Sequence, residues 1–281
     1  VERVKIVIVG AGASGIAAAT KLLENGINDF VILEAQDYYG GRVNTVRFGD
    51  EYVDLGAQWI HGEEGNVVFK MAKPHNLIEK DEFKTTYLQS SGNVLDKEQI
   101  NSILDILDEI TESAYQDLHN YTDSLGNFFN QEYPKMLKKQ SLQSSALTWE
   151  MFDWYQKDLN VEDSSDTWFQ VSGYGYTVYE RCEGFQEWGW KAGGYATLLD
   201  LLMKKIPDAS NELSVGDKIH HQAEVVQILW DDNDEVVVKL RSGGMFIAEH
   251  VVMTVSLGVL KTNSHLMFKP ALPQHKLNSI Q

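Results

Sequence analysis

Six residues near the N-terminus, Gly10-Ala11-Gly12-Ala13-Ser14-Gly15, have the types and the spacing of a turn that binds a diphosphate. Gly10 permits a tight turn from strand to helix, and Gly12 lets the backbone approach a pyrophosphate because it has no side chain. Gly15 lets the helix pack closely on the strand. The unpaired amides in the first turn of that helix offer a partial positive charge to the phosphates. The motif therefore predicts a bound dinucleotide.

A carboxylate stands where such a site holds a ribose. Glu34 follows the apolar run 30–33, about twenty positions after the last glycine of the turn. A carboxylate there accepts hydrogen bonds from the adenosine ribose hydroxyls and disfavours a 2′-phosphate. A glycine turn also occurs in unrelated α/β proteins. The strand before it, the helix after it and the acidic residue together favour the nucleotide.

The elements that must position these residues form a βαβ unit. The apolar run 5–9 predicts the first strand, residues 16–25 predict the helix, and 30–33 predict the second strand. Beyond this unit, apolar spacing predicts helices at 66–76, 97–118, 133–139, 147–157 and 196–205. Strands are predicted at 85–89, 220–222, 224–230, 235–240 and 246–255, with 224–230 and 235–240 paired as a hairpin across 231–234. The aromatic cluster at 151–155 is expected in the core.

Composition excludes several classes of function. The formal net charge is −17, which argues against nucleic acid and is compatible with a cationic substrate. No apolar run is long enough to predict a membrane-spanning helix. Cys182 is the single cysteine, so no intrachain disulfide is expected. His220 and His221 would face opposite sides of a strand, and no HExxH or CxxC motif occurs, so no metal site is predicted.

Two features bear on the cellular location. Residues 120–122 form a glycosylation sequon, Asn-Tyr-Thr, and the chain begins with Val just before the nucleotide motif. The N-terminus is therefore expected to be processed or trimmed. These features leave both a cytoplasmic and a secreted location open, and the composition sets no oligomeric state.

Several further motifs resemble those of flavin-containing amine oxidases. They are Glu34-Ala35, Gly40-Gly41-Arg42, the run 53–59 and, near the other end, the run 251–260 followed by 268–273. Within the family the chain is most similar to polyamine oxidases, namely spermine oxidase and acetylpolyamine oxidase. The run 49–62 looks most like that of animal members, insects included.

The resemblance implies an α/β fold with two domains. A Rossmann-like FAD-binding domain of the GR2 type, with a β-meander, is expected over 1–80 and 215–281, and an α+β substrate domain over 81–214. The strand at 250–255 would return to the parallel sheet. Members of the family continue with a long C-terminal portion whose motifs do not occur here, so the chain is expected to be truncated and its substrate domain incomplete.

The resemblance also implies which residues form the site. Arg42 would neutralise pyrophosphate charge, the run 56–59 would pass beside the flavin ring, and the backbone of Val226 would meet the adenine. His61 resembles the active-site histidine of animal polyamine oxidases, and a neutral imidazole could hold the substrate nitrogen or accept its proton. The residues expected to contact FAD are Gly10, Gly12, Ala13, Ser14, Gly15, Glu34, Ala35, Gly41, Arg42, Gly56, Ala57, Gln58, Trp59 and Val226.

The activity that this resemblance implies is the FAD-dependent oxidation of a polyamine. Spermine, spermidine or an acetylated form would give an aldehyde and a shorter amine, with dioxygen reduced to hydrogen peroxide. One alternative is a truncated or divergent relative that binds flavin or a partner without catalysis. Another is an NAD-dependent dehydrogenase, against which the runs 40–42 and 56–59 argue.

Overall fold

The computed structural model describes residues 1–82, 85–230 and 235–280. The chain divides into two compact units, each described here by itself. Unit 1 comprises Val1–Glu82 and Cys182–Gln281, and unit 2 comprises Phe83–Arg181. Which unit performs which function stays a prediction, and so do the domain boundaries proposed from the sequence.

A seven-stranded sheet organises unit 1, in the order β11-β8-β9-β10-β1-β2-β7. Its strands are β1 (Glu2–Val9), β2 (Phe30–Leu33), β7 (Ile219–His220), β8 (Val225–Leu229), β9 (Val236–Leu240), β10 (Met245–Met253) and β11 (Phe268–Lys269). Strands β10, β1, β2 and β7 are parallel, whereas β8, β9 and β10 form an antiparallel meander. The predicted hairpin and the return to the parallel sheet are confirmed, and the predicted turn 231–234 lies outside the described residues.

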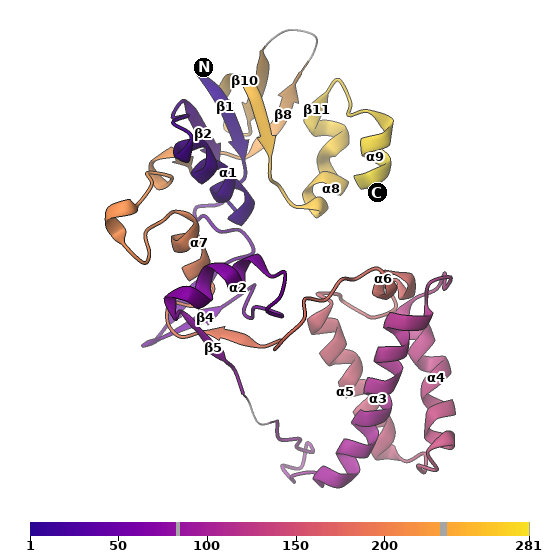
Figure 1. The fold of residues 1–281 in the computed structure, drawn as a ribbon. Helices are drawn as coiled ribbons and strands as arrows, with labels where there is room; N and C mark the ends of the chain where they lie inside the picture. Colours follow the sequence, from indigo (N-terminus) through magenta and orange to yellow (C-terminus); the bar gives the residue numbers. More distant parts are fainter. Residues whose placement is uncertain (83–84, 231–234, 281) are drawn as a thin grey trace. The chain divides into compact units, whose positions relative to one another are not determined.

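Helices, a small hairpin and a second two-stranded sheet complete unit 1 (Figure 1). The helices are α1 (Ala13–Glu24), α2 (Val67–Ala72), α7 (Thr197–Leu202), α8 (Leu257–Met267) and α9 (Gln274–Ile280), with 3-10 turns at Lys73–His75, Ala209–Asn211 and Gly216–Lys218. The hairpin pairs β3 (Thr45–Phe48) with β4 (Glu51–Asp54), and the other small sheet pairs β5 (Ile78–Lys80) with β6 (Trp188–Trp190), which is remote from it in sequence. Together with the sheet, these helices confirm the predicted mixed α/β class.

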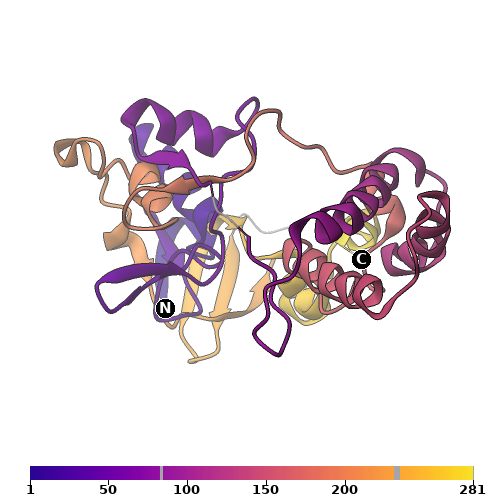
Figure 2. The ribbon, with the colours of Figure 1, turned by 90° about the horizontal axis from the view of Figure 1, so that it is seen from below.

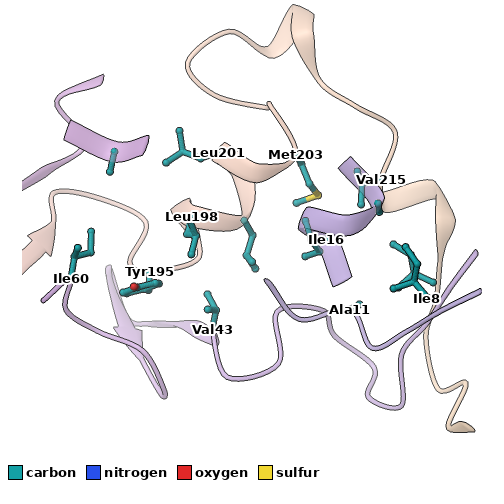
Figure 3. Packing of buried hydrophobic residues seen from close by; sticks show 14 of the residues in the cluster. Ile8, Ala11, Ile16, Val43, Ile60, Tyr195, Leu198, Leu201, Met203 and Val215 are labelled. Atoms are coloured by element: carbon teal, nitrogen blue, oxygen red, sulfur yellow. The ribbon is translucent and has the colours of Figure 1, made fainter. Parts of the chain in front are cut away.

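Both faces of β2 and of the second half of β1 are buried, which explains why residues 6–9 and 30–33 are continuously apolar. On one face, Ile8 packs in a cluster with Ile16 of α1 and Leu198 of α7, and Figure 3 shows these side chains between the elements. On the other face, Val7 and Val9 belong to a second cluster with residues of the meander. The glycine turn therefore starts from a strand that is fixed on both sides.

Unit 2 is helical over its described residues. It contains α3 (Lys97–Asp117), α4 (Leu125–Lys139), α5 (Ala146–Glu162) and the short α6 (Gly173–Thr177). Figures 1 and 2 both show α3, α4 and α5 lying side by side. Its core is rich in aromatic residues, and the ring of Trp168 is fully buried beside Phe129 and Phe152. No helix in the described parts of the chain is long and apolar enough to cross a membrane.

One prediction for this region was wrong, and another was right about a helix but not about where it begins. Residues 85–89 form no strand in the described structure, because only an isolated bridge joins Leu88 to Val94. The helix predicted from residue 133 begins at Leu125, where the Ser124 side chain accepts a hydrogen bond from the amide of Asn127. The cluster at 151–155 is mainly core, as predicted, although Trp154 is only half-buried.

Asp163, at the end of α5, gives unit 2 a pH-dependent contribution to stability. Burial raises the pKa of its carboxyl, although the Tyr176 hydroxyl donates a hydrogen bond to Oδ2 at 2.7 Å. A raised pKa means that the protonated form is favoured on folding, so this contribution is lost as the pH rises through the folded pKa. We expect Asp163→Asn to stabilise unit 2 by roughly half a kcal/mol at pH 7 and to have no effect near pH 3, measured by thermal unfolding. A larger gain at pH 3 than at pH 7 would contradict this.

Candidate functional site

The glycine turn lies between β1 and α1, at the carboxyl ends of the parallel strands. Gly10 has φ +102°, a conformation that glycine adopts without strain. Its amide donates a hydrogen bond to the carbonyl oxygen of Leu33 at 2.9 Å. Strands β2 and β10 flank β1. The connection after β1 leads to β2 on one side, and the connection after β10 leads to β11 on the other side, so the turn lies where the two connections diverge. Ligands of open α/β sheets bind at such a position.

The N-terminus of α1 is suited to an anion. Gly12 is the N-cap residue, and no side chain caps the helix by a hydrogen bond. The first turn also contains no acidic residue. Ser14 is exposed and Ala13 is half-buried in that turn. A Cβ on Gly12 would have Gly40 O, at 3.8 Å, as its nearest neighbour. The first-turn amides, which lack intrahelical partners, can therefore face a diphosphate.

Gly15 packs α1 against the turn. A Cβ at this position would lie 1.9 Å from the carbonyl oxygen of Gly10, which is far inside van der Waals contact. The structure thus gives Gly15 the close packing that the sequence predicts for it.

Glu34 is buried beside the turn, with an exposed fraction of 8%. Its Oε2 accepts a hydrogen bond from the amide of Ala11 at 2.7 Å, and its Oε1 accepts one from the amide of Gln36 at 2.9 Å. Each carboxylate oxygen can accept a further bond, so a ribose can still be held. The sequence predicted only the ribose role, whereas the structure shows that Glu34 also holds the turn. Ala35 next to it is exposed.

Of the predicted residues, Gly41 lies beside Gly12, and Gly56 and Ala57 lie against Arg42. Gly12 forms an isolated parallel bridge with Gly40, and a Cβ on Gly41 would lie 3.6 Å from the Cα of Gly12. The carbonyl oxygen of Arg42 accepts a hydrogen bond from the amide of Ala57 at 3.1 Å, and a Cβ on Gly56 would lie 2.0 Å from that same oxygen. The Arg42 side chain is exposed.

Trp59 and His61 lie on either side of a backbone bridge. Ile60 pairs with Trp188, with its amide 3.0 Å from the carbonyl oxygen of Trp188. The Trp59 indole donates a hydrogen bond to Asp81 Oδ2 at 3.2 Å. The His61 side chain is exposed, and its carbonyl oxygen accepts a hydrogen bond from Asn66 Nδ2 at 2.9 Å. The backbone around the histidine is therefore fixed, while its ring is accessible; Gln58 is exposed as well.

The segment just before Val226 is hydrogen-bonded to the residues that follow β2. The amide of Ala223 donates a hydrogen bond to the carbonyl oxygen of Glu34 at 2.8 Å, and the amide of Gln222 donates one to Gln36 at 2.9 Å. Three residues later, the pairing of β8 with β9 shifts register between Val225 and Gln227, which places Val226 at a bulge. The regular pairing of β8 with β9 is therefore interrupted at Val226, and the contact of its backbone with adenine stays a prediction.

Two features that position the site were not predicted. Thr254 hydrogen-bonds the carbonyl oxygens of Val9 and Gly10. The Asp54 side chain accepts hydrogen bonds from the Thr45 hydroxyl and from the amide of Tyr195. These bonds connect the β3–β4 hairpin to the start of α7. For Thr254, the only sequence signal was that a polar residue directly follows an apolar strand. Within the described residues, no group of three or more His, Cys, Asp or Glu side chains could hold a metal.

Comparison with known families identifies this arrangement. A sequence profile described as flavin containing amine oxidoreductase matches residues 13–281. The chain belongs to this family. The membership predicted from the runs 34–35, 40–42, 53–59 and 251–260 is thereby confirmed.

Several curated relatives match the whole chain. Protein anon-37Cs of Drosophila simulans is 29% identical over 100% of this chain and 56% of its own length. Probable polyamine oxidase 5 of Arabidopsis thaliana is 27% identical over 100% of this chain and 60% of its own length. Polyamine oxidase 1 of Zea mays is 27% identical over 98% of this chain and 57% of its own length. The chain thus spans little more than half the length of these relatives.

The family assignment supports FAD as the cofactor, as the sequence predicted. The N-terminus of α1, where no side chain caps the helix, fits the diphosphate, and the buried carboxylate of Glu34 fits the ribose. The backbone cluster at residues 40–42 and 56–57 presents small residues beside them. The residues present therefore fit the diphosphate and ribose part of the cofactor.

Gly12→Ala separates cofactor binding from folding. Because its Cβ would meet only Gly40 O, at 3.8 Å, we expect stability to change by less than about 1 kcal/mol. The added methyl group would occupy the approach of the diphosphate, so we expect FAD affinity to fall about tenfold or more. Thermal unfolding and a flavin fluorescence titration measure the two effects. Unchanged FAD affinity would show that the diphosphate does not approach Gly12.

Proposed function

We propose that this chain contributes to the FAD-dependent oxidation of a polyamine. The observation that carries the proposal is the cradle in which Gly12 caps α1 without a side chain while Glu34 is buried beside it. The names of two relatives, polyamine oxidase 1 and probable polyamine oxidase 5, support the substrate class. The formal net charge of −17 is compatible with a cationic substrate.

The proposed reaction converts a secondary amine into an aldehyde and a shorter amine. Bound FAD would supply the acceptor for a hydride equivalent from the carbon next to the amine nitrogen, and dioxygen would take up the two electrons and two protons as hydrogen peroxide. The substrate nitrogen must first lose its proton, because an ammonium withdraws electrons from the adjacent C–H bond. The imine then takes up water and separates into the two products.

The proposed role of His61 concerns this proton. Its ring is exposed, and its backbone is held by the Ile60–Trp188 bridge and by Asn66. A neutral imidazole can hold the substrate nitrogen or accept its proton at Nδ1 or Nε2. Arg42, whose side chain is exposed next to Gly41, would neutralise diphosphate charge.

The proposed division of labour follows the family pattern. Residues 1–80 and 215–281 would form a Rossmann-like FAD-binding domain of the GR2 type, and residues 81–214 would belong to the substrate domain. The parallel order β10-β1-β2-β7 supports the first part of this assignment. The second part rests on the resemblance.

The visible absorption spectrum during anaerobic addition of spermine tests the function. We expect the purified chain, supplied with FAD, to show flavin bands that bleach with spermine, spermidine or an acetylated form. His61→Asn keeps a polar side chain without a titratable ring, and we expect it to slow bleaching more at pH 7 than at pH 9.

The other outcomes of this experiment identify the alternatives. Flavin bands that persist with all three amines would contradict catalysis and favour a noncatalytic flavin-binding relative. If no flavin bands remain after removal of free cofactor, the claim that this chain holds FAD by itself is wrong. Equal bleaching rates for His61→Asn and the unaltered chain would remove His61 from the proposal.

A further inference from the structure

Thr254, the first residue after β10, lies against the glycine turn. Its hydroxyl Oγ1 is 2.8 Å from the carbonyl oxygen of Val9 and 3.0 Å from that of Gly10, and its single proton is shared between these two acceptors. Its backbone amide donates a second hydrogen bond to Val9, at 3.0 Å. The end of β10 thus holds both peptide units at which β1 turns toward α1.

Gly10 and Gly15 both lie close to this hydroxyl. A Cβ on Gly10 or on Gly15 would lie 3.0 Å from Thr254 Oγ1. Such a distance is tighter than ordinary van der Waals contact, so both positions leave room for the hydroxyl. Thr254, Gly10 and Gly15 therefore form one junction that joins β10, the turn and α1.

This junction links parts of the chain that are remote in sequence. Gly10 and Thr254 are separated by 244 positions. The parallel pairing of β1 with β10 runs to Val9 opposite Met253, which brings the next residue of each strand together. A glycine turn has many accessible backbone conformations when nothing restrains it, and restraining it lowers the cost of ordering on binding.

We propose that Thr254 is a positioning residue that fixes the Gly10 turn and thereby sets the affinity of the chain for the dinucleotide. The hydroxyl keeps the first amides of α1 aimed at the diphosphate without contacting it. The effect on affinity rests on the FAD binding proposed above, whereas the effect on the turn does not.

Three variants test the role of the hydroxyl. Thr254→Val keeps the shape and removes the donor, and Thr254→Ser keeps the donor and removes the methyl group. Thr20→Val is the matched control, because Thr20 is buried in the same unit and its hydroxyl donates to the carbonyl oxygen of Leu202 at 2.9 Å. It loses a comparable long-range hydrogen bond away from the turn.

Two readouts follow the turn and the cofactor separately. Hydrogen exchange of a peptide covering residues 9–15 reports on the amides of Gly10 and Ala11, which are bonded to Leu33 and Glu34. A flavin fluorescence titration gives the Kd for FAD. For Thr254→Val we expect about fivefold faster exchange and about fivefold weaker FAD binding, the effect of one lost hydrogen bond. For Thr254→Ser we expect both within about twofold of the unaltered chain.

The control decides between a local and a general effect. Thr20→Val should lower the unfolding temperature without changing exchange at residues 9–15 or FAD affinity. Equal changes in Thr20→Val and Thr254→Val, or no change in Thr254→Val, would overturn the proposal. If the unaltered chain binds no FAD, the proposed function fails at its cofactor, and the exchange comparison alone then supports or overturns the role of Thr254 in the turn.

Discussion

Replacing Gly15 with alanine is expected to destabilise unit 1 by about 3 kcal/mol and to abolish FAD binding at micromolar cofactor concentrations. The added Cβ would lie 1.9 Å from the carbonyl oxygen of Gly10, which is a backbone atom and cannot rotate away. Helix α1 must then move off β1, which opens a core that includes the fully buried side chains of Ile8 and Ile16. Chemical denaturation monitored by tryptophan fluorescence, together with a flavin titration, measures both losses.

Two other glycines make the interpretation of Gly15→Ala specific. Gly216→Ala adds the same methyl group where nothing lies within 4 Å, so we expect a change of less than about 0.5 kcal/mol and normal FAD binding. Gly12→Ala should fold normally and bind FAD weakly. A Gly15→Ala protein with the stability of Gly216→Ala would contradict the packing of α1 described here.

The βαβ unit could be predicted from sequence because its determinants are local. The predicted strand at 30–33 coincides with β2, and the predicted first strand and helix overlap β1 and α1. The spacing from Gly15 to Glu34 depends only on the length of one helix and one strand. Position along the chain therefore sufficed to place Glu34 beside the turn, whereas its contact with a ribose stays a prediction.

The second bonding role of Glu34 could not be predicted, because it depends on where a backbone amide points after folding. The same holds for Thr254, which meets Gly10 only because β10 lies parallel to β1. The cluster of residues 40–42 and 56–57 was assembled from resemblance, since no local pattern states that Gly56 packs on the carbonyl of Arg42. Packing between residues that are remote in sequence decides such contacts, and the spacing of apolar residues along the chain carries no information about that packing.

The wrong strand prediction at 85–89 has a related cause. β-Branched and aromatic residues, such as the threonines and Tyr87 of this run, indicate a strand only where another strand is available as a partner. In the described structure Leu88 finds a single bridge with Val94, and Tyr87 instead packs edge-on against Trp154 of α5 at 4.9 Å. The helix α3 was predicted nearly to the residue because its stabilising contacts follow its own period and Asp96 caps its start.

Glu34→Ala is expected to weaken FAD binding about 100-fold and to destabilise the turn by about 2 kcal/mol. The amide of Ala11 would lose its 2.7 Å partner in a buried position, which accounts for the loss of stability. The ribose hydroxyls would lose a charged acceptor, and two such hydrogen bonds account for the loss of affinity. Thermal unfolding and a flavin titration report the two effects.

The two roles of Glu34 can be separated with a ligand that lacks one hydroxyl. We expect the unaltered chain to bind ADP more tightly than 2′-deoxy-ADP, because Glu34 accepts a hydrogen bond from the 2′-hydroxyl. Glu34→Ala should bind both ligands equally, since the acceptor is gone, and this coupling isolates the ribose contact from the loss of turn stability. Glu34→Gln keeps one amide oxygen as an acceptor and should give an intermediate preference. If Glu34→Ala still prefers ADP by the original factor, the carboxylate acts only on the turn, through Ala11 and Gln36.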